Sequence, residues 1–169
     1  ALVIGADTMS SIIDYTDRTT CVLFGDGAGA VIVEPAVEEG LEIIGFEHEI
    51  DGSGGPALQM PAGGSLNPAS HETVEKRMHY VKQDGSTVFK FAVRRTGELC
   101  DRLMARNNVT AADIDLFVSH QANRRIIMSA AERLGLPPEK VVINIEKYGN
   151  TTAGTIPLQA RRPIPEFAD

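Results

Sequence analysis

Two polar side chains, His120 and Asn150, are the first candidates for chemistry in this sequence. His120 follows the apolar run 116–118 after one residue, Ser119; that run predicts a strand, and a helical pattern comes after His120. Asn150 comes shortly after a second predicted strand, residues 141–145. Ligands of open α/β sheets bind at the carboxyl ends of the strands. We therefore predict that both side chains converge on one substrate atom, with a turn or helix-capping role as the alternative for Asn150.

Two adjacent arginines, Arg124 and Arg125, lie at the start of the helix predicted after His120. The N-terminus of a helix is an electrostatically unfavourable place for cations. The pair therefore indicates either an anionic ligand or two solvated side chains. A basic group on the preceding predicted helix is equally compatible with a docking patch or a solvent-exposed face, and its members are Lys90, Arg94 and Arg95.

A glycine-rich segment formally matches the dinucleotide-binding fingerprint through Gly25, Gly27 and Ala30. That fingerprint should open a helix, whereas this segment leads into the β-branched run 31–33 and then a proline. The sequence therefore predicts a turn at which another part of the backbone approaches closely.

The two cysteines, Cys21 and Cys100, have no spacing that would suit a disulfide framework or a zinc site. They fit a reducing compartment, and we expect a cytoplasmic protein. Both lie among apolar residues, so we predict buried hydrophobic side chains rather than nucleophiles. No metal site is predicted, because ligand-like spacing is absent among His48, His71 and His79.

The composition is that of a folded, acidic chain. Its 169 residues suffice for one domain or part of a larger one, and 43% hydrophobic residues exclude a disordered chain. Sixteen Lys and Arg against 23 Asp and Glu give a net charge of −7, which argues against a nucleic-acid-binding protein. No apolar run reaches the roughly 18 residues that a membrane span needs.

The elements that must position these side chains alternate between helix and strand in the last third of the chain. Apolar residues at helical spacing predict helices over 86–107 and 124–134. Their alternation with strands predicts an α/β layered fold with a mixed or parallel sheet. Earlier in the chain we expect a buried strand over residues 1–6 and two further strands over 31–33 and 41–50. We expect a long loop over residues 51–64.

The two ends differ from those of a complete protein. The chain begins inside a predicted strand, and its last stretch, 161–169, is broken by two prolines. We therefore expect a fragment of a longer protein.

Four short motifs occur together in this chain, over residues 17–20, 24–30, 120–125 and 149–154. Their combination resembles the β-ketoacyl-acyl-carrier-protein synthase III family of the thiolase superfamily. The resemblance implies a thiolase-like layered α/β fold, incomplete here, with a mixed sheet and helices on its faces. It divides the chain into three parts. Residues 1–84 are the end of the N-terminal half with a long connecting loop, and residues 85–158 are the C-terminal half that carries His120 and Asn150. Residues 159–169 are an atypical tail.

The resemblance also assigns roles to individual residues. It implies that His120 and Asn150 are catalytic. It implies a carrier-protein-binding segment made of Gln121, Ala122, Asn123, Arg124 and Arg125, and coenzyme A contacts from Arg18, Phe89 and Asn123. The family's nucleophilic cysteine belongs to a turn upstream of residue 1, so neither Cys21 nor Cys100 matches it.

The implied activity is a decarboxylative Claisen condensation of acetyl-CoA with malonyl-carrier protein, which starts fatty acid synthesis. It needs no metal or redox cofactor, and the family implies a homodimer with acyl carrier protein as its partner. We expect the chain by itself to be inactive, because it lacks the cysteine. The alternatives are a related condensing enzyme with another acceptor, either hydroxymethylglutaryl-CoA-synthase-like or a polyketide starter enzyme, and a non-catalytic carrier-protein-binding fragment.

Overall fold

The computed structural model describes residues 1–36 and 42–159. Its strands are β1 (Leu2–Asp7), β2 (Gly27–Ile32), β3 (Leu58–Gln59) and β4 (Lys82–Gln83). Its α-helices are α1 (His71–Glu75), α2 (Gly85–Asn107), α3 (Arg124–Arg133), α4 (Ile145–Tyr148) and α5 (Thr155–Gln159). Short 3-10 turns connect them, namely η1 (Met9–Ile12), η2 (Gly52–Ala57), η3 (Ala111–Asp113), η4 (Pro138–Lys140) and η5 (Thr152–Gly154).

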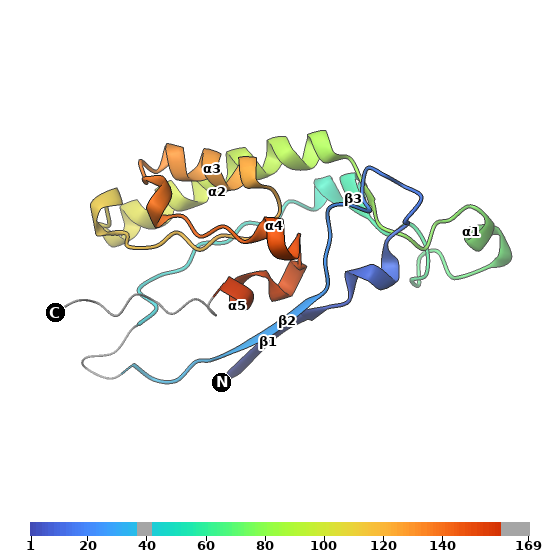
Figure 1. Ribbon diagram of the computed structural model, residues 1–169, viewed down its shortest axis with the longest axis horizontal. Helices are drawn as coiled ribbons and strands as arrows, with labels where there is room; N and C mark the ends of the chain where they lie inside the picture. Colours follow the sequence, from blue (N-terminus) through green and yellow to red (C-terminus); the bar gives the residue numbers. More distant parts are fainter. Residues whose placement is uncertain (37–41, 160–169) are drawn as a thin grey trace.

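Strands β1 and β2 form an antiparallel pair whose register runs from Leu2 opposite Ile32 to Asp7 opposite Gly27. Helix α5 lies along this pair (Figure 1). The glycines of β2 make the close approach possible, because a Cβ on Gly27 would lie 2.8 Å from that of Thr151. A Cβ on Gly29 would lie 2.5 Å from the Cβ of Pro157. The prediction of a close backbone approach at the glycine-rich segment is confirmed.

Helices α2 and α3 lie side by side and form a second layer above the strands (Figure 1). Helix α2 begins where the Asp84 carboxylate accepts hydrogen bonds from two backbone N–H groups of the first turn, and it ends at Asn108 in a left-handed conformation. The side chain of Asn123 caps α3 by accepting from the N–H of Arg125 at 2.8 Å. Both predicted helices, 86–107 and 124–134, are therefore confirmed to within a residue or two.

The prediction of strands over 41–50, 116–118 and 141–145 was only partly right. Residue 41 lies outside the described residues, and 42–50 forms no strand within the described chain. The other two segments share one parallel bridge, between Phe117 and Val141, and Ile145 already belongs to α4. A strand needs a neighbour to complete its hydrogen bonds, and the described residues offer these segments almost none.

Ion pairs attach the segment 42–50 to helix α2 in place of strand pairing. Glu47 and Glu49 both form ion pairs with arginines of α2. Glu47 accepts from Arg106 at 2.6 Å, and Glu49 accepts from Arg102 at 3.1 Å. These ion pairs connect the segment to α2.

The prediction that residues 1–6 form a buried strand was wrong in one respect. β1 is a strand, but Leu2 is 62% exposed and Ile4 is 65% exposed. One face of the pair packs on η5 and α5, and the other is uncovered in the described chain. The predicted loop 51–64 contains η2 and β3, and the predicted tail 159–169 lies outside the described residues except for Gln159.

Candidate functional site

His120 lies between the bridge at Phe117 and the start of α3. Its ring is accessible to solvent and also lines a mainly apolar cavity of about 300 Å³ between α2 and α3. Thr96, Ala122 and Ile126 line the same cavity. The protein atoms around the ring disfavour its charged form and lower the pKa of His120 from its ordinary value of 6.5. His120 therefore presents a neutral imidazole at neutral pH.

Asn150 is fixed by its backbone and by its side-chain oxygen. Its N–H donates to Leu23 at 2.9 Å, and its carbonyl accepts from the N–H of Gly25 at 3.0 Å. Its side-chain Oδ1 accepts from the N–H of Thr152 at 3.0 Å. The turn role considered as an alternative is therefore present, yet it uses only the oxygen. Within the described chain the Nδ2 group makes no hydrogen bond, and it is a donor that a substrate oxygen can accept.

The turn that follows Asn150 holds an unusual backbone conformation. Thr152 has φ of 47°, in the left-handed region that β-branched residues rarely adopt. Asp7 at the end of β1 holds this turn, because its Oδ2 accepts from the Thr152 hydroxyl and from the N–H of Ala153 at 2.9 Å. The hydrogen bond from Thr152 is the main reason that the pKa of Asp7 is lowered. Strain of this kind persists only where the surroundings impose it, and it is common at functional sites.

Gln121 is completely interior, with 1% of its surface exposed. Its Oε1 accepts from the N–H groups of Asn144 and Ile145 at 3.0 and 3.1 Å. Its Nε2 donates to the backbone carbonyl of Val142 at 3.0 Å. The resemblance predicts that Gln121 contacts a carrier protein, but this buried position does not allow a direct surface contact.

The remaining residues of the expected carrier-protein segment are at or near the surface. Arg124 and Arg125 are exposed, whereas Ala122 and Asn123 are half-buried. The guanidinium carbon of Arg125 lies 5.1 Å from the centre of the Phe89 ring on α2. The fold therefore brings together Phe89, expected to contact coenzyme A, and Arg125, expected to contact the carrier protein.

The third residue expected to contact coenzyme A, Arg18, is exposed in the turn between η1 and β2. This turn is fastened at its base by Asp14, a buried carboxylate that accepts from Arg77 Nε at 2.9 Å and Nη2 at 2.5 Å. Among the described residues, no hydrogen bond or ion pair connects Arg18 with His120, Asn150 or Arg125. The structure places Arg18 without testing its predicted role.

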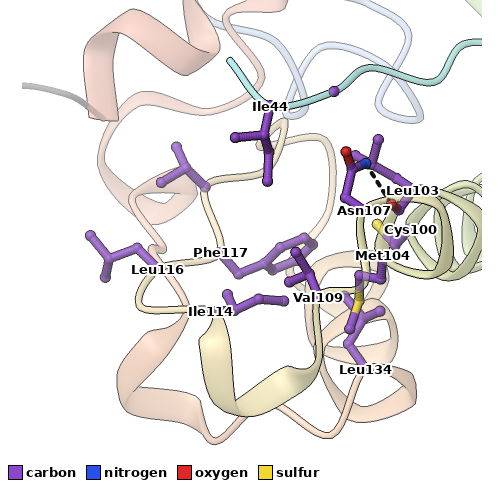
Figure 2. Close-up of a pocket in the computed structure, with 12 residues that line it drawn as sticks. Ile44, Cys100, Leu103, Met104, Asn107, Val109, Ile114, Leu116, Phe117 and Leu134 are labelled. Carbon is purple, nitrogen blue, oxygen red and sulfur yellow. Dashed lines mark hydrogen bonds between the residues drawn. The ribbon is translucent and has the colours of Figure 1, made fainter. Parts of the chain in front are cut away.

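Both cysteines are partly buried among apolar side chains, as predicted. Cys21 packs against the cluster of Met9, Ile13 and Val81. Cys100 lines an apolar cavity of about 410 Å³ at the far end of α2 (Figure 2). Burial raises the pKa of the Cys100 thiol above its ordinary value, which leaves little reactive thiolate.

Two negative observations concern the described residues only. Within ranges 1–36 and 42–159, three or more His, Cys, Asp or Glu side chains never come together as metal ligands would. Among the helices formed there, none has the length and apolar character for crossing a bilayer.

Solved structures define the class of this fold. The chain superimposes on a 3-oxoacyl-(acyl carrier protein) synthase III from Pseudomonas aeruginosa with a TM-score of 0.79 at 40% identity, covering 95% of this chain and 47% of that one. The corresponding Aquifex aeolicus enzyme gives 0.80 at 40% identity, with 94% and 46% covered. The fold is therefore the thiolase-like α/β fold of condensing enzymes, present here in part. Sequence comparison narrows this class to one family.

Two family models match this chain, 3-oxoacyl-[acyl-carrier-protein] synthase III over residues 1–52 and 3-oxoacyl-[acyl-carrier-protein] synthase III C terminal over residues 104–164. The chain belongs to this family. It is 62% identical over 167 residues to the β-ketoacyl-[acyl-carrier-protein] synthase III of Solibacter usitatus, and 57% identical over 166 residues to that of Koribacter versatilis. Each alignment covers 98% of this chain and 50% of the relative, so the chain spans about half the length of these curated relatives.

Sequence reasoning missed the residues that support the site. Asp7, Thr155 and Gln159 reach the segments of His120 and Asn150 from positions more than thirty residues away. No local pattern could have identified them, because their partners are distant in sequence.

Proposed function

We propose that this chain supplies the decarboxylating half of a β-ketoacyl-acyl-carrier-protein synthase III, which condenses acetyl-CoA with malonyl-carrier protein. The observation that carries the proposal is the pair of available donors, the neutral imidazole of His120 and the free amide Nδ2 of Asn150. The names of the relatives at 57–62% identity support the same reaction. The substrates are thioesters, and the reaction itself requires no bound cofactor.

The chemistry needs a place for negative charge on oxygen. Loss of carbon dioxide from the malonyl thioester leaves the electron pair of the broken C–C bond in an enolate, whose charge is concentrated on the thioester oxygen. An N–H of His120 and the Nδ2–H of Asn150 would donate to that oxygen. A donor already oriented before the reaction contributes about 3 kcal/mol to the stability of such a transition state.

The carbanion then attacks an acetyl thioester on the enzyme's cysteine. The new C–C bond gives the acetoacetyl-carrier protein, and the cysteine leaves as a thiolate. The family's cysteine lies outside the segment that the resemblance covers, and Cys100 is unsuited to the role because its pKa is raised. The cysteine must therefore come from the half of the relatives that this chain does not match.

The carrier protein is proposed to dock on the exposed cations near the start of α2 and α3. Arg124, Arg125, Lys90 and Arg94 are all exposed. Arg95 is excluded from this face, because it pairs with Glu98 at 2.8 Å and Glu49 at 3.2 Å. A locally basic face lets a chain of net charge −7 bind an acidic partner, since screening makes nearby charges dominate. We propose coenzyme A contacts for Phe89, Asn123 and Arg18.

A hybrid enzyme tests the proposal, in which residues 1–159 replace the matching part of the Solibacter usitatus relative. It should form acetoacetyl-carrier protein and release carbon dioxide from malonyl-carrier protein. His120→Ala and Asn150→Ala should each slow carbon dioxide release by about 100-fold. Matched controls are His48→Ala and Asn107→Ala, which lie away from the site. Release at the unaltered rate in both site variants would refute the proposal.

A second candidate has one specific observation in its favour. The priming β-ketosynthase of the R1128 polyketide pathway matches this chain at 32% identity with a TM-score of 0.69. Offering the hybrid enzyme malonyl-carrier protein, malonyl-CoA or acetoacetyl-CoA as acceptor distinguishes a fatty acid enzyme from a polyketide or hydroxymethylglutaryl-type enzyme. Binding of carrier protein without carbon dioxide release would indicate the non-catalytic alternative.

A further inference from the structure

The peptide that carries His120 is held on both sides by hydrogen bonds from buried side chains. On one side, the carbonyl of Ser119 accepts from Gln159 Nε2 at 2.8 Å and from Gln121 Nε2 at 3.1 Å. On the other side, the backbone N–H of Gln121 donates to the Thr155 hydroxyl at 2.9 Å. Gln121, Thr155 and Gln159 are each at most 5% exposed. The backbone of His120 therefore cannot shift without breaking hydrogen bonds to these buried side chains.

The side chain of Gln121 also contacts the segment that leads to Asn150. Gln121 Oε1 accepts from the N–H groups of Asn144 and Ile145, which begin α4. Helix α4 ends at Tyr148, and Gly149, its C-cap, directly precedes Asn150. One amide group thus joins the two segments that carry the proposed catalytic side chains.

We propose that Gln121 is a positioning residue, which sets the distance between His120 and Asn150, and that it does not contact the carrier protein. The proposal rests on the function proposed above. The amide is the group required, because its nitrogen must donate to carbonyls of Ser119 and Val142 while its oxygen accepts from two N–H groups. A shift of about 1 Å at a reacting group can cost about 100-fold in rate. Loss of the amide should therefore reduce kcat and leave the KM for carrier protein unchanged.

Gln121→Glu in the hybrid enzyme is the sharpest test, because it keeps the shape of the side chain. At pH 8 the introduced carboxylate faces the carbonyl oxygens of Ser119 and Val142 and repels them. At low pH its protonated form regains one donor. We expect kcat for carbon dioxide release to fall about 10- to 100-fold at pH 8, and to recover toward the unaltered enzyme's value as the pH is lowered to 6. The KM for malonyl-carrier protein should change less than about twofold, since no surface contact is lost.

Two further variants separate positioning from general destabilisation. Leu136→Ala removes a buried side chain at the other end of α3 and should lower Tm with kcat unchanged. Thr155→Val should lower kcat because it removes the acceptor for the Gln121 N–H, whereas Thr155→Ser retains it and should behave as the unaltered enzyme. A Gln121→Glu variant with unchanged kcat at pH 8, or with a raised KM and normal kcat, would overturn the proposal. The His120→Ala and Asn150→Ala variants report separately on the proposed function.

Discussion

The guanidinium of Arg125 at the start of α3 stacks over the ring of Phe89 near the start of α2, 5.1 Å from its centre. This contact crosses between the two long helices, and it fixes an exposed cation where a helix N-terminus disfavours it. The arrangement explains how a cation can be kept in one orientation at this end of the helix layer. Near His120, Arg125 is exposed whereas Gln121 is buried. We therefore expect substitutions of Arg125 to affect binding of a partner and substitutions of Gln121 to affect the reaction rate.

Arg125→Glu should weaken the use of carrier protein much more than the use of acetyl-CoA. We expect the KM of the hybrid enzyme for malonyl-carrier protein to rise about tenfold, because the variant loses the stacked cation and adds a like charge against an acidic partner. The effect should shrink as salt is added, since the pair is exposed. Lys76→Glu, the same charge reversal at the residue that follows α1, is the control. Equal losses in cysteine acetylation and in carrier-protein use would contradict the docking role.

The pKa of His120 should be below 6.5 in the folded protein, because the surrounding protein atoms disfavour its charged form. An NMR titration of the ring resonances measures this, with His120→Gln used for assignment. The unfolded chain takes up a proton before the folded one does. The stabilising contribution is therefore fully present above pH 6.5 and is lost as the pH falls through the folded-state pKa. A titration midpoint above that of a free histidine would show that the environment has been misread.

How far the sequence predicts this structure depends on the range of each interaction. Asn123 was identifiable as a helix cap because capping acts within three residues. The role proposed for Gln121 was not, because most of its hydrogen-bond partners lie more than twenty residues away, from Val142 onward. The motif that includes Gln121 suggested a binding surface, yet its neighbours point outward and Gln121 points inward. Strand predictions failed where a segment such as 42–50 has no partner among the described residues.

Gly27→Ala should destabilise the fold through the contact between β2 and the segment that follows Asn150. The added methyl group would lie 2.8 Å from Thr151 Cβ and 2.8 Å from Leu158 Cδ1. Overpacking of this kind costs about 1–3 kcal/mol, which urea unfolding of the hybrid enzyme measures. Gly52→Ala is the matched control, because nothing lies within 4 Å of its added methyl group. An equal effect of the two substitutions would mean that the close approach at Gly27 contributes nothing.

The chain by itself should not become acetylated by acetyl-CoA. Cys100 lies in an apolar cavity, and burial raises its pKa, so the thiolate that must attack the thioester is scarce at neutral pH. Cys21 lies in a turn, and its side chain is half-buried against an apolar cluster. We expect radiolabelled acetyl-CoA to leave the chain unlabelled, whereas the hybrid enzyme should take up about one acetyl group per chain on the cysteine from its other half. Stoichiometric label on Cys21 or Cys100, released by hydroxylamine, would place the nucleophile within this chain and overturn the division of roles proposed above.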